Sequence, residues 1–135
     1  MKIAIVDDDP SVREALARFL TVNDMECTAF SSGSRFLDSL TGESPDCLLL
    51  DLQMPDMSGQ AVQRALREAG FFMPVIVITA NRDSGVQGRA LEAGAVACLA
   101  KPVDTDLLLG TIRRLEVDDR RSAMAGPGFQ YSSAL

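Results

Sequence analysis

The chain has 135 residues, 47% of them apolar, which is enough for one domain with its own core. With 13 basic and 19 acidic residues the formal charge is −6, so no broad positive surface is available for nucleic acid or an anionic membrane. No apolar run approaches the roughly 18 residues of a membrane span, and no secretory signal is visible. We therefore expect a single cytoplasmic domain that does not bind DNA directly.

The chain contains three cysteines, Cys27, Cys47 and Cys98, which are scattered through apolar segments. Their odd number and irregular spacing fit neither a disulfide framework nor a metal site. We expect buried, reduced thiols.

Short apolar runs alternate regularly with longer amphipathic stretches. The strand candidates, in chain order, are Lys2–Val6, Met25–Phe30, Cys47–Leu50, Val75–Thr79 and Ala95–Ala100. The helix candidates, with apolar residues at helical spacing, are Ser11–Val22, Gly33–Leu40, Gly59–Ala69, Ser84–Ala93 and Asp104–Val117. The pattern is that of five βα units.

Alternating βα units predict an α/β fold with a parallel sheet and helices on both faces. The first, third and fourth strand candidates are almost wholly apolar, as expected for strands covered on both sides. The second is more mixed, which indicates an edge strand. We predict a doubly wound, flavodoxin-like sheet of five strands in the order 2-1-3-4-5.

The regular pattern decays after about residue 117, and Gly126-Pro127-Gly128 cannot continue a helix. We expect one domain over residues 1–117 and a flexible tail or linker stub over residues 118–135.

Polar residues follow the apolar strands where each strand ends: Asp7 and Asp8 after the first, Asp51 after the third, Thr79 at the end of the fourth and Lys101 after the fifth. Taken singly, each has a structural explanation, since an aspartate after a strand is common turn chemistry. However, the carboxyl ends of parallel strands border one crevice. The three acids, the hydroxyl and the ammonium are therefore expected to converge.

The composition of this cluster favours a hard divalent cation. Carboxylates that share a crevice repel one another unless a cation is present, and oxygen ligands without His or Cys suit Mg²⁺. Beside such an ion, a carboxylate is a competent nucleophile toward a phosphoryl group, and a hydroxyl and a lysine stabilise the transferred oxygens. Asp9, which precedes Pro10, is expected to cap the first helix instead.

These residues occur in motifs that resemble those of the receiver domain of bacterial two-component response regulators. The motifs are Ile-Val-Asp-Asp-Asp-Pro-Ser-Val-Arg, Asp51-Leu-Gln-Met-Pro-Asp-Met-Ser-Gly59, Val-Ile-Val-Ile-Thr79-Ala, and Ala-Gly-Ala-Val-Ala-Cys-Leu-Ala-Lys101-Pro102. The second motif most resembles receivers of transcription regulators with a helix-turn-helix output.

The resemblance implies that Asp51 accepts a phosphoryl group from a sensor histidine kinase. It further implies that Asp8 and Asp51 bind Mg²⁺ directly, that Asp7 acts through a bound water, and that the backbone carbonyl of Gln53 is another ligand. Thr79 would bind a phosphoryl oxygen and move on activation, and Lys101 would pair with another oxygen.

By the same resemblance, Pro102 follows a cis peptide bond, and the side chains of Gln53 and Asn81 tune the lifetime of the phosphoryl group. Cys98 departs from the family, which usually has Tyr or Phe there as a switching ring. We interpret Cys98 as a small strand residue beside the fourth helix. The resemblance places the output, and an expected homodimer contact, on the face formed by the fourth helix, fifth strand and fifth helix.

The leading hypothesis is a signalling domain that is not an enzyme beyond self-phosphorylation and autodephosphorylation, and that controls transcription through an output domain. Three alternatives stay open: a stand-alone regulator acting by protein contact, a pseudo-receiver that is never phosphorylated, and a Mg²⁺-dependent phosphatase. The last usually carries Asp-x-Asp on its first strand and a cap insertion, whereas this chain has Asp-Asp-Asp and no connection long enough for a cap.

Overall fold

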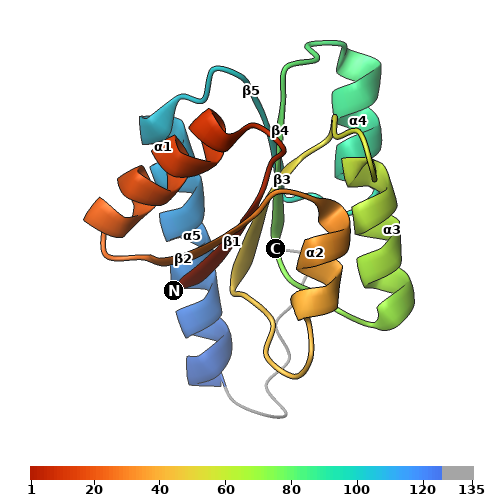
Figure 1. Ribbon diagram of the computed structural model, residues 1–135. Helices are drawn as coiled ribbons and strands as arrows, with labels where there is room; N and C mark the ends of the chain where they lie inside the picture. Colours follow the sequence, from red (N-terminus) through yellow and green to blue (C-terminus); the bar gives the residue numbers. More distant parts are fainter. Residues whose placement is uncertain (126–135) are drawn as a thin grey trace.

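Five parallel strands form one sheet at the centre of the molecule (Figure 1). The computed structural model describes residues 1–125, with side chains to residue 118. The strands are β1 (Lys2–Val6), β2 (Glu26–Phe30), β3 (Cys47–Asp51), β4 (Val75–Thr79) and β5 (Ala97–Ala100). They lie in the order β2-β1-β3-β4-β5, and each neighbouring pair is parallel. The predicted doubly wound sheet is confirmed.

Helices cover both faces of this sheet, as Figure 1 shows. One face carries α1 (Pro10–Val22) and α5 (Thr105–Ala125), and the other carries α2 (Gly33–Ser39), α3 (Gly59–Ala69) and α4 (Ser84–Glu92). Within residues 1–125, no helix is both long and apolar enough to cross a membrane.

The sheet separates two apolar cores, because successive strand residues point to opposite faces. Ile3 and Ile5 of β1 pack with Leu20 of α1 and Ile112 of α5. Val6 packs on the other side, in a cluster that includes side chains of α2 and α3. Burial on both faces explains why β1, β3 and β4 are apolar at nearly every position.

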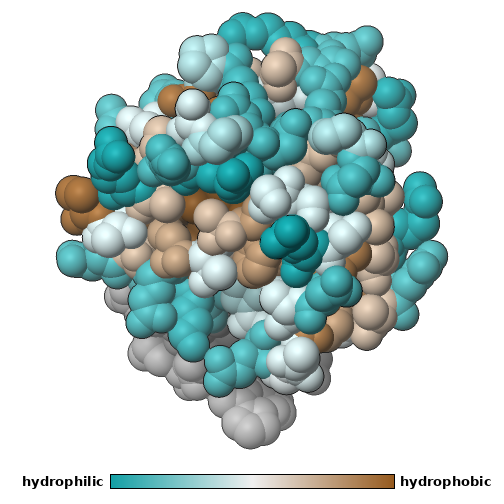
Figure 2. All heavy atoms as spheres, in the orientation of Figure 1, coloured by the Kyte–Doolittle hydropathy of each residue, from teal (hydrophilic) through white to brown (hydrophobic). Residues whose placement is uncertain are grey.

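The strand β2 lies at the edge of the sheet, as its mixed composition predicted. None of its residues is fully buried, whereas every residue of β3 and β4 is buried. Among the strands described, only β1 pairs with it. Figure 2 shows a largely hydrophilic surface on this side, with paler and brown atoms gathered in its middle.

The helix α5 is longer than the sequence predicted. We expected it to end near Val117, but it continues to Ala125. Residues 118–125 contain neither Pro nor Gly, and their Ala, Arg and Met are good helix formers. The expected end of regular structure at residue 118 is therefore wrong, and the domain boundary there stays a prediction. Residues 126–135, the rest of the predicted tail, lie outside the described residues.

The cysteines are free thiols that differ in burial. Cys47 is buried, as expected, but Cys27 and Cys98 are only half-buried. Burial raises the pKa of all three thiols, to about 12 for Cys47, where the charge of Asp46 adds to the effect. At neutral pH they are therefore protonated, which is the unreactive form.

Candidate functional site

The polar residues at the strand ends meet at one edge of the sheet. Asp51 is the last residue of β3 and Thr79 the last of β4, while Asp7 and Lys101 directly follow β1 and β5. Asp7, Asp51 and Thr79 are buried, with exposed fractions of 2%, 4% and 0%. Buried polar side chains at the ends of apolar strands need partners, so their arrangement decides what the site can do.

Three carboxylates converge at this edge. Asp7, Asp8 and Asp51 each offer an oxygen atom, and these oxygens lie within 4.8 Å of one another. The Asp8 side chain is exposed, so the group opens to solvent on that side. An oxygen-only set of this kind suits a hard divalent cation such as Mg²⁺, which retains several waters when bound to proteins. The donor set thus fits the metal implied by the sequence.

The ammonium group of Lys101 bridges two of these carboxylates. Its Nζ lies 2.9 Å from Oδ2 of Asp7 and 3.5 Å from Oδ2 of Asp51. Burial lowers the pKa of Lys101, but the hydrogen bond to Asp7 and the charges of Asp51 and Asp7 outweigh that effect and raise it overall. Lys101 is therefore a permanent cation at neutral pH, held over the acidic group.

The carboxyl group of Asp51 is harder to ionise than an ordinary aspartate. Desolvation by burial and then the charge of Asp7 raise its pKa from 3.8 to about 6. The Gln53 amide and the charge of Lys101 oppose this shift without cancelling it. At neutral pH the carboxylate is charged in spite of its neighbours, so a divalent cation would relieve their repulsion.

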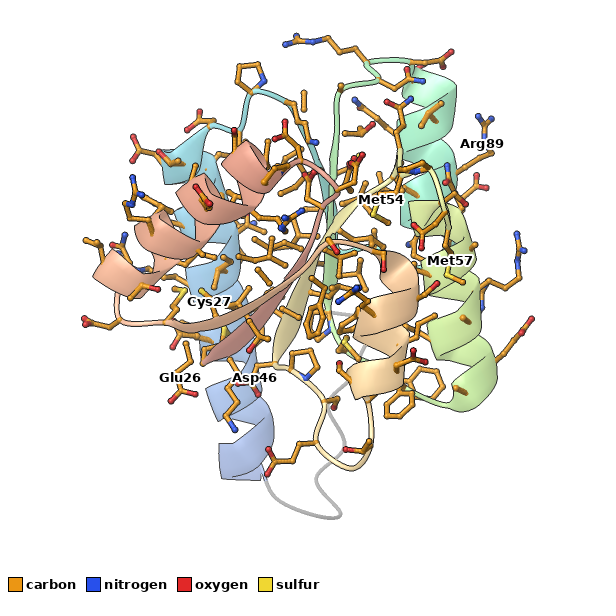
Figure 3. All side chains as sticks on the ribbon, in the orientation of Figure 1. Glu26, Cys27, Asp46, Met54, Met57 and Arg89 are labelled. Carbon is orange, nitrogen blue, oxygen red and sulfur yellow. The ribbon has the colours of Figure 1, made fainter. Side chains whose placement is uncertain are left out.

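The loop after Asp51 is held in place by both backbone and apolar contacts. The Gln53 N–H donates to Oδ1 of Asp51 at 3.2 Å, and the Gln53 side chain is exposed. Figure 3 shows Met54 and Met57 after β3, and both pack with the core on the face covered by α2, α3 and α4. Whether the Gln53 carbonyl binds metal stays a prediction.

Gly59 brings the start of α3 against the backbone of this loop. Its N–H donates to the Leu52 carbonyl at 2.9 Å. A Cβ atom at position 59 would lie 2.6 Å from the carbonyl oxygen of Asp51 and 2.7 Å from Cα of Leu52. Only glycine allows this approach, which fixes the backbone that carries Asp51.

We expect Gly59→Ala to lower the free energy of unfolding by roughly 1–2 kcal/mol, because the atoms that the new Cβ meets are backbone and must shift. The matched control is Gly88→Ala in α4, where a Cβ has nothing within 4 Å and should add up to about 1 kcal/mol through helix propensity. Urea unfolding measures both changes. Equal stabilities of the two variants would contradict the close approach at Gly59.

Three short hydrogen bonds connect Thr79 with the start of α4. The Asn81 N–H donates to Oγ1 of Thr79 at 3.0 Å, and the Asp83 N–H donates to Oδ1 of Asn81 at 2.9 Å. Asp83 caps α4 by accepting from the Gly85 N–H at 2.7 Å. A displacement of the Thr79 hydroxyl would therefore break or move the first bond of a series that ends at this helix.

The structure places the remaining predicted residues around this group. The Lys101–Pro102 peptide bond is cis, the form that the resemblance implied. Cys98 lies on β5 opposite Val77 of β4 and packs against the core on the face of α2, α3 and α4, outside the acidic group. Asn81 belongs to the loop that leads into α4. Their switching and tuning roles stay predictions.

The sequence predicted no role for Arg13, the last residue of the first receiver-like motif. Its Nη1 donates to the backbone carbonyl of Asp7 at 2.8 Å. Arg13 lies on α1, six residues after Asp7. The sequence signal that could have predicted the contact was this spacing, which places the arginine in the first turn of the helix that follows the strand.

The model of the response regulator receiver domain family matches residues 3–113 of the chain. The chain belongs to this family. Its receiver domain is 41% identical over 110 residues to the DNA-binding transcriptional regulator NtrC of Klebsiella pneumoniae, covering 82% of this chain and 24% of NtrC. It is equally 41% identical over 111 residues to the response regulator protein TodT of Pseudomonas putida, covering 82% of this chain and 49% of TodT. The chain thus spans from about a quarter to about half of these relatives.

Solved structures of other response regulators share the fold of this receiver domain. The response regulator StyR is 38% identical, with a TM-score of 0.80, and the match covers 91% of this chain and 63% of StyR. A receiver protein from Burkholderia phymatum is 44% identical, with a TM-score of 0.74, covering 84% of this chain and 93% of that protein. These matches confirm the family and the fold predicted from the sequence motifs.

Proposed function

We propose that this receiver domain accepts a phosphoryl group on Asp51, in the presence of Mg²⁺, from the phosphohistidine of a sensor histidine kinase in the cytoplasm. The observation that carries the proposal is the convergence of Asp7, Asp8 and Asp51 within 4.8 Å, with the Lys101 ammonium against two of them. Membership of the receiver family, whose model matches residues 3–113, supports the same reaction.

Each residue has a defined task in this reaction. A carboxylate oxygen of Asp51 attacks phosphorus, a P–O bond forms, and the bond from phosphorus to the histidine nitrogen breaks. Asp8 and Asp51, the Gln53 carbonyl, and Asp7 through a water would hold Mg²⁺, which neutralises charge on the transferred oxygens when bound.

Lys101 and Thr79 act on the phosphoryl oxygens. The Lys101 ammonium pairs with one of them, and the Thr79 hydroxyl donates to another. A displacement of Thr79 is then transmitted to α4 through the hydrogen bonds at Asn81 and Asp83. Because Cys98 is not aromatic, this route does not depend on a swinging ring.

The output of the domain is proposed to lie on the face formed by α4, β5 and α5. Large apolar side chains are exposed on or beside these elements: Leu91 of α4 is 47% exposed, Val96 before β5 is 48% and Leu107 of α5 is 52%. Such residues are suited to a protein contact, either with a second copy or with an output domain. Relatives such as NtrC, named a DNA-binding transcriptional regulator, make control of transcription the favoured output. Action as a stand-alone regulator is the alternative.

Incubation with Mg²⁺ and acetyl phosphate or phosphoramidate tests the proposal. Intact-mass measurement should show one added phosphoryl group in the wild type and none in Asp51→Asn, because the amide is not a nucleophile. The control is Asp56→Asn, which removes the same negative charge at an exposed position of the same loop. This variant should be phosphorylated normally.

Other outcomes of this experiment favour the other functions. A wild type that never acquires the adduct would indicate a pseudo-receiver that acts by binding alone. Sustained hydrolysis of many unrelated phosphoesters would indicate a phosphatase. The domain has no Trp, so mass or NMR is a better readout than intrinsic fluorescence.

A further inference from the structure

Arg13 contacts the backbone between the two acids that follow β1. Its side chain reaches back from α1, is half-buried, and donates through Nη1 to the carbonyl oxygen of Asp7 at 2.8 Å. Among the described side chains, no ion pair involves Arg13. The guanidinium group therefore binds a backbone carbonyl that lies beyond the end of β1, and not a carboxylate.

This carbonyl belongs to the peptide unit that joins Asp7 to Asp8. A peptide unit is planar, so a hydrogen bond to its oxygen restrains the orientation of the whole plane where Asp7 is already held at the end of β1. The next plane, between Asp8 and Asp9, is held as well, because the Asp9 N–H donates to Oδ1 of Asp7 at 2.9 Å. Asp8 thus lies between two anchored planes, and together they set the direction in which its exposed side chain leaves the backbone.

The other contacts of Asp7 do not replace this bond. Its N–H donates to the Phe30 carbonyl at 3.2 Å, which continues the pairing of β1 with β2, and its Oδ2 accepts from Lys101. These two contacts involve the N–H and the side chain of Asp7, and neither involves its backbone carbonyl. The carbonyl held by Arg13 lies on the Asp8 side, and a hydrogen bond to a charged donor is among the stronger ones available to it.

We propose that Arg13 is a positioning residue for the Mg²⁺ site. Arg13 holds the peptide unit between Asp7 and Asp8 so that both carboxylates face Asp51. The inference rests on the metal site of the proposed function and adds a residue that does not itself touch the ion. Residues that orient metal ligands typically change metal affinity by about ten- to a hundredfold when replaced.

Positioning and simple electrostatics predict opposite signs for the loss of Arg13. A positive charge close to a dication repels it, so its removal alone would strengthen Mg²⁺ binding. If Arg13 orients the two aspartates, its removal instead weakens Mg²⁺ binding. Lys101 differs from Arg13, since it contacts the Asp7 and Asp51 carboxylates directly and competes with a metal for them.

The test is a Mg²⁺ titration of Arg13→Gln, Arg13→Lys and Arg18→Gln. The NMR shifts of the backbone amides around Asp51 report Mg²⁺ binding. Arg18 is exposed on the same helix, so Arg18→Gln removes the same charge without removing the contact. We expect the dissociation constant to rise about tenfold in Arg13→Gln, to rise less in Arg13→Lys, which keeps a donor, and to stay within about twofold in Arg18→Gln. At saturating Mg²⁺, the rate of phosphorylation by acetyl phosphate should return to near the wild-type value.

Tighter or unchanged Mg²⁺ binding in Arg13→Gln would overturn the positioning role, as would an equal loss in Arg18→Gln. If circular dichroism shows that Arg13→Gln does not fold, Arg13→Lys decides, and wild-type affinity in that variant together with a wild-type rate at low Mg²⁺ overturns the inference. A wild-type domain that binds no Mg²⁺ would overturn both this inference and the proposed function. Normal Mg²⁺ binding with no effect at Arg13 would overturn this inference alone.

Discussion

Asp8→Ala should weaken Mg²⁺ binding at least tenfold and prevent phosphorylation by acetyl phosphate. Asp8 supplies one of the three carboxylates that lie within 4.8 Å, and its side chain is the exposed member of the group. Without it, the remaining two acids offer a hard cation too little negative charge to displace its waters. Mg²⁺ titration by NMR and intact-mass measurement of the phosphoryl adduct check this result.

Asp9→Ala is the matched control for Asp8→Ala. Asp9 is the N-cap of α1, and its side chain accepts from the Ser11 N–H at 2.9 Å, which confirms the predicted helix cap. Removing the cap should cost about 1 kcal/mol of unfolding free energy. The backbone N–H of residue 9, which donates to Asp7, remains in the variant. Phosphorylation should therefore be normal, and equal losses in the two variants would contradict this division of roles.

Asp51→Asn should stabilise the metal-free domain at pH 7.5 by about 3 kcal/mol. The folded protein raises the pKa of Asp51 from 3.8 to about 6, a difference of about 2 units at about 1.4 kcal/mol each. A raised pKa means that the folded state holds the proton more tightly than the unfolded chain does. The resulting stability is complete below pH 3.8 and is lost as the pH rises through 6. Asparagine is neutral throughout and avoids that loss.

The pH and Mg²⁺ dependence of this effect distinguishes it from a general gain in packing. In urea unfolding with EDTA, the advantage of Asp51→Asn should shrink as the pH falls from 6 and disappear near pH 4. Added Mg²⁺ should stabilise the wild type more than the variant, because a ligand stabilises the state that binds it. Asp56→Asn should show neither effect, and a constant advantage of Asp51→Asn at all pH values would contradict the electrostatic cause.

The local pattern of the chain was sufficient to predict the fold. Apolar runs such as Val75–Thr79 are interrupted by amphipathic stretches, and this alternation restricts the chain to a parallel sheet covered on both faces. Because the carboxyl ends of parallel strands meet, the positions of Asp7, Asp51, Thr79 and Lys101 at strand ends also predicted a shared edge. Asp9 before Pro10 predicted the cap of α1.

The same pattern could not predict where helices end or which side chains are in contact. The end of α5 depends on weak local preferences over residues 118–125, where composition alone suggested a tail. The position of the Lys101 ammonium against both Asp7 and Asp51, and the raised pKa of Asp51, follow from burial and distances of a few ångströms.

The sequence by itself determined the order of the elements, the edge of the sheet that carries the acids, and the types of residue found there. Only the tertiary structure decided that Arg13 holds the peptide unit between two of these acids, that Gly59 contacts the backbone of Asp51, and that Thr79 is connected to α4. The physical reason is that periodicity and strand ends are visible in the order of the residues. Hydrogen bonds and desolvation instead depend on the three-dimensional path of the loops and on where side chains come to rest, even between residues that are close in the sequence.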